Sequence, residues 1–240
     1  MGKFIEPLED RRLLSAVTGA SLFGPIVTGE TWGYETLQSG KVIATSTNKL
    51  VGATKFNGIA ATELDATVTA KAAGSSAITT KSYDGLDSKK DEIAYGAVTV
   101  ANISYSGYKG TSTSTTVFTP PSEIFPASLT AGTTYTATWT GKTTTAISVS
   151  TPFGPIKNTT TSTDTVKFSV ELVSTTLATI VVPAGTYKCY LIDETIATTI
   201  SGKTTTTTSQ LWAAPSVGVV KSVTGTGSNA VTTELTSYKA

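Results

Sequence analysis

Strict alternation of apolar and polar side chains is the feature of this sequence that most limits its fold. Residues 166–172 read Val-Lys-Phe-Ser-Val-Glu-Leu, and the stretches 64–70 and 135–139 alternate in the same way. Successive side chains of a β-strand point to opposite faces, so each stretch has one apolar and one polar face. No helical period recurs beyond residue 22. The pattern predicts an all-β, antiparallel fold whose strands have one face in solvent.

In residues 166–172 the alternation also assigns individual side chains. The sequence predicts that Val166, Phe168, Val170 and Leu172 are buried and that Lys167, Ser169 and Glu171 are exposed. A slip of one residue in the pairing register would expose all four apolar side chains.

Threonine composition supports the same fold class. The chain has about 50 threonines, roughly a fifth of its residues, and the β-branched carbon of threonine favours extended structure. Runs such as 111–116 and 204–208 are expected to form threonine ladders on strand positions that face solvent.

The spacing of turn residues predicts about a dozen strands. We expect an antiparallel sandwich or a half-open barrel, formed by one all-β domain over residues 22–240 after an N-terminal segment at 1–21. Pro120-Pro121 marks an internal boundary near 120–126, interpreted as a connection between two sheets, because paired prolines do not fit a central strand. The expected strands are near 35–43, 58–70, 77–83, 92–104, 113–118, 133–140, 143–151, 164–173, 177–182, 186–200, 204–213 and 217–238, the last split at 225–229.

Composition also argues against several function classes. The chain has no histidine, one cysteine and a net charge of +1 with scattered lysines and arginines. It therefore lacks the commonest acid–base group and metal ligand, and it lacks the basic surface that nucleic acid requires. Cys189 falls on the apolar face of an expected strand and is interpreted as a small buried hydrophobe. We expect no enzymatic activity, no cofactor and no metal.

Four candidate sites have plainer structural interpretations. Glu63 and Asp65 share a strand face, but it is the solvent face opposite Leu64. Residues 84–92 hold several carboxylates, interpreted as an exposed charged turn because lysines interrupt the spacing of a calcium loop. The glycines at 225–227 are not followed by a helix, as a dinucleotide site requires, and Ser106 with Lys109 lies in a glycine-flanked loop.

The N-terminus carries a short motif in which cationic residues precede an uncharged run at 13–29. It resembles the sorting motif Leu-Glu-Pro-Arg-x-Leu-Leu-Ser at the start of many planctomycete exported proteins, with Asp10 in place of the proline. The resemblance implies export to the cell surface or the extracellular space. The uncharged run is too short and interrupted to predict a transmembrane span. The matching residues are Leu8, Glu9, Arg11, Leu13, Leu14 and Ser15.

Further motifs occur at 29–34, 129–135, 182–187, 212–221 and 234–238. The first reads Gly-Glu-Thr-Trp-Gly-Tyr, and the last three read Val-Pro-Ala-Gly-Thr-Tyr, Trp-Ala-Ala-Pro-Ser-Val-Gly-Val-Val-Lys and Glu-Leu-Thr-Ser-Tyr. Together they resemble a family of small exported bacterial β-proteins of unsettled function. The resemblance covers residues 23–238 and implies no catalytic residue.

Two function hypotheses remain. The first is an exported, non-enzymatic structural protein of the cell surface or extracellular matrix. As a self-assembling filament subunit, it would donate its N-terminal segment as a strand to a neighbouring subunit. Its partners would be copies of itself or cell-envelope components. The second is a secreted or periplasmic binding module that holds an apolar ligand, such as a lipid, on a curved sheet. In both, the expected structural core includes Trp32, Trp139, Phe168, Tyr187 and Trp212.

Overall fold

The computed structural model describes residues 16–18, 27–72, 76–105 and 108–240. The sorting-motif residues lie outside these ranges. Most described residues are in strands, and the helical structure is limited to one short 3-10 turn, η1 (Gly227–Asn229). The predicted all-β, antiparallel fold class is therefore confirmed.

Fifteen strands make up the described part of the chain. They are β1 (Ala16–Thr18), β2 (Thr31–Gln38), β3 (Lys41–Phe56), β4 (Ile59–Ala70), β5 (Ile78–Leu86), β6 (Glu92–Tyr105), β7 (Tyr108–Phe125), β8 (Ser128–Thr130), β9 (Thr134–Thr151), β10 (Gly154–Leu172), β11 (Ala178–Val182), β12 (Gly185–Ile200), β13 (Lys203–Ala214), β14 (Gly218–Thr224) and β15 (Val231–Lys239).

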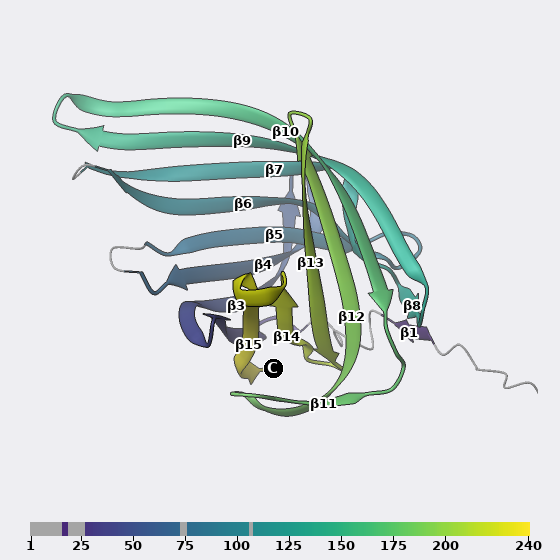
Figure 1. The fold of residues 1–240 in the computed structure, drawn as a ribbon. Coiled ribbons are helices and arrows are strands. Elements are labelled where there is room, and N and C mark those ends of the chain that lie inside the picture. The colour runs from purple at the N-terminus through teal and green to yellow at the C-terminus, as the bar shows by residue number, and fades with distance from the viewer. Residues whose placement is uncertain (1–15, 19–26, 73–75, 106–107) are drawn as a thin grey trace, which may run out of the picture.

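Twelve of these strands close into a single antiparallel ring (Figure 1). The order around the ring is β10-β9-β7-β6-β5-β4-β3-β2-β15-β14-β13-β12, and β12 pairs again with β10. The closing seam runs from Asp164 opposite Ile200 to Leu172 opposite Ile192. β11 pairs with the beginning of β12, on the side of β12 opposite β13, and β1 pairs with β8 in a separate two-stranded sheet.

Tight turns connect several neighbouring strands. Ser39-Gly40, Asn57-Gly58 and Ser201-Gly202 each form a two-residue loop in which both residues have positive φ. Such loops match the twist of the strands they join, and glycine at the second position removes the steric cost. These local signals make the β2–β3, β3–β4 and β12–β13 connections hairpins.

The ring is closed over only part of its length. β12 meets β10 from Asp164 onward, while residues 154–163 of β10 pair with β9 alone. This free part of β10 extends about 33 Å at 3.3 Å per residue. In Figure 1 the β9–β10 hairpin and its neighbours β7 and β6 project well beyond the β12–β13 hairpin. The molecule is therefore a barrel at one end and an open curved sheet at the other.

The buried core lies at the closed end. One cluster contains Phe168, Val170, Leu172 and Ile192 from the seam, with Val17 of β1 and Leu129 of β8 packed on it. A second cluster joins the ends of the last strands and contains Val182, Cys189, Ala214, Val220 and Leu235. Large buried apolar side chains thus concentrate where β10 and β12 pair.

The strand expectations were confirmed in outline, but several bounds were wrong: β7 is longer than the expected 113–118, and the strands expected at 133–140 and 143–151 are the single strand β9. The expected strand near 35–43 ends too early, because β3 continues to Phe56, and the expected strand near 164–173 begins ten residues too late. Both missed parts lack the alternation that identified the others. Residues 154–163 are mostly polar, and all of them are exposed.

The interpretation of Pro120-Pro121 as a link between two sheets was wrong. Both prolines lie inside β7, which pairs with β6 on either side of them. Its pairing with β9 stops at Thr119, immediately before the prolines. Proline has no N–H to donate, so β7 leaves β9 here and keeps β6 as its partner.

Of the side chains assigned from the alternation of 166–172, the four apolar ones are buried as predicted and Lys167 is exposed. Ser169 and Glu171 are half-buried rather than exposed. Hydrogen bonds from β9 explain part of this difference, because Thr134 donates to Glu171 and Thr136 lies 3.4 Å from the Ser169 hydroxyl.

Candidate functional site

The sequence motifs meet at the closed end of the barrel. Trp32 Nε1 donates to the carbonyl of Val217 at 2.9 Å, and the Tyr34 hydroxyl donates to the carbonyl of Val219 at 3.0 Å. Val217 precedes β14, and Val219 lies at the start of β14, which pairs with β13 there but with β15 only from Lys221 onward. The motifs at 29–34 and 212–221 are thereby joined by hydrogen bonds, which gives them a structural role.

Tyr238, at the end of the last motif, completes this arrangement. Its hydroxyl donates to the buried Glu30 carboxylate at 2.7 Å. This hydrogen bond, with a smaller effect of burial, raises the pKa of Tyr238 to about 12. Ala184, from the motif at 182–187, donates its backbone N–H to Leu235.

The five expected core aromatics lie in or against the two buried clusters. Phe168 is buried, and Trp139 is half-buried beside it with ring centroids 6.0 Å apart. Trp32, Tyr187 and Trp212 are half-buried against the second cluster. Cys189 is buried there, and burial raises the pKa of its thiol to about 11, which opposes formation of the reactive thiolate.

The pair Glu63 and Asp65 lies on the outside of the barrel, as the sequence predicted. Lys81 of the neighbouring strand is 2.5 Å from Glu63 and 3.4 Å from Asp65. A lysine beside the two carboxylates compensates part of their charge, so the three side chains form an ion cluster on the outer face.

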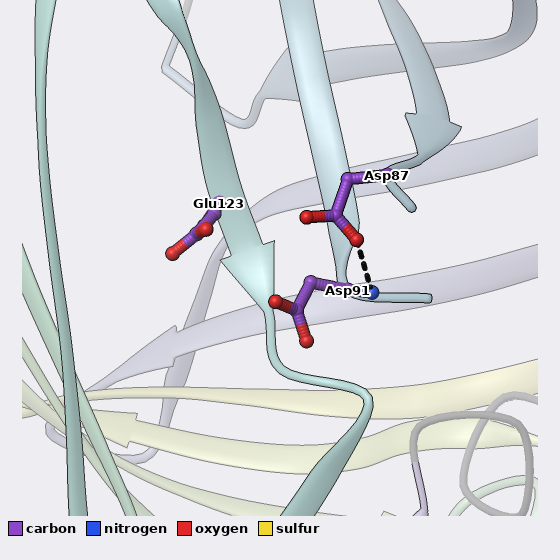
Figure 2. A group of neighbouring side chains, drawn as sticks. All are labelled: Asp87, Asp91 and Glu123. Carbon is purple, nitrogen blue, oxygen red and sulfur yellow. Dashed lines mark hydrogen bonds between the residues drawn. The ribbon is translucent and has the colours of Figure 1, made fainter. Parts of the chain in front are cut away.

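Three carboxylates approach one another beside the β5–β6 turn (Figure 2). Asp87 and Asp91 belong to the turn, and Glu123 arrives from β7; one oxygen of each lies within 4.8 Å of the others. Such oxygens are the ligand type that calcium and magnesium take. Sequence reasoning missed Glu123 because it is 32 residues beyond Asp91 and no local spacing links the two.

Hydrogen bonds give this carboxylate group a structural role. Asp87 accepts the backbone N–H groups of Lys89 and Asp91 at 2.8 and 2.9 Å. Asp91 accepts the N–H of Ala127 at 2.6 Å, and Glu123 accepts the Tyr135 hydroxyl. The group thus fastens the β5–β6 turn to the chain that follows β7. An opening of about 300 Å³ adjoins it where Pro120 and Pro121 leave β9.

The face of the sheet that points into the barrel can be followed by register, because paired residues lie on the same side of a sheet. Phe168 pairs with Ala137 of β9. Every second residue along a strand, together with its partners on the neighbouring strands, lies on this face. Followed from strand to strand, the face passes through all twelve strands and ends at Ile192 of β12, which pairs with Leu172 of β10. We call this continuous surface the inner face.

Beyond the core, the inner face carries small side chains and is not packed. Residues that pair across β3–β7, β9 and β10 form rows perpendicular to the strands. In three neighbouring rows the residues are half-buried or exposed, and none is buried. Val68 and Ile78, which pair with each other, are 41% and 43% exposed although both are apolar. These positions include Ser46, Asn48, Ala66, Val68, Ile78, Thr80, Thr99, Ala101, Ser112, Ser114, Thr145, Ile147 and Thr160.

Hydroxyl groups line much of this surface. Thr80 lies 3.0 Å from Thr99, Ser114 lies 2.9 Å from Thr145, and nearby Thr116 lies 2.8 Å from Thr143, each measured between the hydroxyl oxygens. Threonine ladders were expected on solvent-facing positions only. Pairs such as Thr67–Thr79 and Thr144–Thr161 do lie on the outer face, but the inner face carries them as well.

A second opening lies where β13 continues beyond the end of β14, and residues of both faces line it. It has a volume of about 420 Å³, and its lining includes Glu194, Ser209 and Thr226. Glu194 and Ser209 pair across β12 and β13 on the inner face. Burial raises the pKa of the Glu194 carboxyl. The candidate site is therefore the unfilled inner face, with this opening at its side.

Comparison with known proteins finds partial similarities. Residues 138–234, from β9 to β15, match the family described as DUF3108-like. A protein from Parabacteroides distasonis named as a "putative lipoprotein" is similar in structure, with 12% identity, a TM-score of 0.41, and coverage of 91% of this chain and 98% of that one. A protein from Bacteroides fragilis with a YmcC-like fold has 12% identity, a TM-score of 0.39, and coverage of 92% and 100%. No curated protein matches the chain.

The described part of the chain contains no helix with the length and apolarity that a bilayer crossing requires.

Proposed function

We propose that this protein is an exported, non-enzymatic binding module that holds an elongated, largely apolar molecule against its inner face. The observation that carries the proposal is the exposure of apolar side chains inside the ring, above all the Val68–Ile78 pair. Side chains can fill a barrel of about eight strands, whereas wider barrels enclose a cavity. A ring of twelve strands lined by alanine, serine and threonine leaves such space.

The rival hypothesis, a polymeric structural subunit, needs the N-terminal segment to be available to a neighbour. The described part of that segment, Ala16–Thr18, pairs with Ser128–Thr130 of the same chain. Val17 is buried in the chain's own core. This intramolecular pairing favours the binding module over strand donation.

Export and the absence of catalysis are part of the proposal. The sorting-type motif at the N-terminus supports export. The lack of histidine and the buried, weakly acidic Cys189 support a non-enzymatic role. A serine nucleophile needs an activating base, usually histidine, and a cysteine nucleophile reacts as the thiolate.

The proposal can be tested by filling the inner face. We expect the neutral apolar dye N-phenyl-1-naphthylamine to gain fluorescence on binding to the full chain. Thr99→Trp, on the inner face of β6, should weaken dye binding at least tenfold by occupying the space. Val100→Trp is the matched control, because the adjacent side chain lies on the outer face and should leave binding unchanged.

Equal loss of binding in the two tryptophan variants would contradict the proposed site. Absence of any dye binding by the parent protein would contradict the proposed function. Circular dichroism and melting curves of both variants establish that each is folded.

A further inference from the structure

Charge is unevenly divided between the two faces of the ring. The outer face carries lysines along its length, among them Lys49, Lys81, Lys142, Lys167 and Lys221. Between the hairpin ends, and apart from Lys188 at the start of β12 where β12 pairs with β11, the inner positions described in the twelve strands include carboxylates but no lysine or arginine. The carboxylates there include Asp84, Asp164 and Glu194.

The lysines on the inner side lie at the ends of hairpins. Lys41, Lys55 and Lys203 are each within two residues of the turns 39–40, 57–58 and 201–202. They are exposed at these ends. Within the body of the described inner face, an anionic group would therefore meet no positive side chain.

The carboxylate of Asp164 lies over the inner face of β9. A Cβ built on Gly141, its partner in register, would come within 2.8 Å of Asp164 Oδ1. Asp164 is the first residue of β10 that pairs with β12. Along β10 it therefore lies between the buried core and the hydroxyl-bearing part of the inner face. An anion that entered the barrel toward the core would approach this negative charge.

The rest of the lining suits an uncharged amphiphile. Threonine offers both a methyl group and a hydroxyl, and the pairs Thr80–Thr99 and Ser114–Thr145 alternate with aliphatic positions such as Ile78 and Ile147. Hydroxyls can donate to and accept from neutral polar groups, whereas an anion stripped of water needs a cation or several aimed N–H groups.

We propose that the ligand of the inner face is an amphiphile with an aliphatic chain and an uncharged, hydroxyl-bearing head, and that the inner carboxylates together with the absence of inner cations exclude anionic amphiphiles. This inference rests on the proposed function, because it specifies the chemical class of the molecule held at the same site.

Three probes with the same ten-carbon chain test the charge requirement: decyl maltoside, decanoate and decylammonium, each titrated below its micellar concentration by calorimetry at pH 8. Decyl maltoside is expected to bind, and decanoate is expected to bind at least tenfold more weakly. Maltose without a chain is expected not to bind.

A cation introduced on the inner face should relax the exclusion. We expect Thr99→Lys to raise the affinity for decanoate at least tenfold and Val100→Lys, on the outer face, to leave it unchanged. Ser114→Lys on β7 serves as a second inner variant if the first does not fold. Asp164→Asn should also raise decanoate affinity severalfold, with Glu171→Gln on the outer face of the same strand as its control.

The outcomes separate this inference from the proposed function. Decanoate that binds as tightly as decyl maltoside, or binds more tightly, overturns the charge requirement and leaves the binding module intact. Failure of all three decyl probes and of the naphthylamine dye overturns both. Tighter decanoate binding by the outer Val100→Lys variant also overturns the assignment to the inner face.

Discussion

At the scale of single residues, polar side chains at the closed end mostly satisfy backbone groups that strand pairing leaves unpaired. Trp32 and Tyr34 bind carbonyls of the chain around Gly218, and Asp87 and Asp91 bind backbone N–H groups of turns. Leaving such groups buried and unpaired costs about 1–3 kcal/mol each. These side chains therefore stabilise irregular connections and need no catalytic explanation.

Asp84 is an exception, and it makes stability depend on pH. Its Oδ1 is buried without a hydrogen-bond partner, and burial, with a contribution from Glu92, raises its pKa from 3.8 to about 7. A carboxyl whose pKa is higher in the folded state binds protons more tightly there. Its stabilising effect is fully present at low pH and is lost as pH rises from about 4 to 7.

We predict that Asp84→Asn stabilises the protein at pH 8 by roughly 2 kcal/mol relative to the parent, because the amide carries no charge to desolvate. The advantage should shrink toward pH 4. Urea unfolding of both proteins at pH 4, 6 and 8 measures it. Asp65→Asn, beside Lys81 on the outer face, is the control and should bring no gain at pH 8. A constant difference between parent and variant at all three pH values would contradict the assignment.

At the scale of the elements, β10 has two halves with different surroundings. Residues 164–172 lie between β9 and β12, so their N–H and C=O groups are used on both sides. Residues 154–163 have β9 on one side only among the described strands, and the run already contains Pro155. An unpaired strand edge can pair with other chains, and proline and lysine on that edge oppose such pairing. The free half of β10 contains one of each, Pro155 and Lys157.

This difference predicts the result of a proline scan along β10. In the free half, alternate N–H groups point away from β9, so one of Thr160→Pro and Thr161→Pro should be tolerated while the other destabilises. In the seam, Phe168→Pro and Ser169→Pro should both cost about 3 kcal/mol or more, because each removes a hydrogen bond to one neighbour or the other. Chemical denaturation of the four variants provides the measurement. Tolerance of either seam variant would show that the ring is not closed there.

At the scale of the whole molecule, the closed end and the open end of the barrel have different roles. The closed end contains the packed clusters and therefore most of the apolar burial that stabilises the fold. The open end contributes strand pairing and an unfilled inner face. A binding surface of this kind stays accessible because the core that supports it lies elsewhere.

We predict that the full-length protein sediments as a monomer, because Val17 and its strand are used within the chain. Analytical ultracentrifugation at 1–100 μM, roughly the range in which micromolar self-association appears, tests this. A polymer that disappears when residues 1–15 are removed, with a folded monomer remaining, would restore the structural-subunit hypothesis.

The sequence determined the local properties of this protein. Alternation set the strand type and the buried side of 166–172, turn residues placed hairpins, and composition excluded histidine chemistry and argued against a nucleic-acid surface. Each depends on residues close together in the chain or on simple counts. For the inner face, alternation correctly placed Leu64, Ala66 and Val68 on one side of their strand. It also implied that this side is buried, which is wrong for Val68, because burial depends on what covers the face.

Tertiary structure decided which segments meet. Pairing of β10 with β12 closes the ring, Glu123 joins Asp87 and Asp91, and Trp32 reaches Val217 across 185 positions of sequence. No local pattern specifies such pairings, because strand order and register follow from the combined burial and hydrogen bonding of distant segments. The open inner face is a consequence of the same choice: twelve strands in one ring enclose more space than their own small side chains can fill.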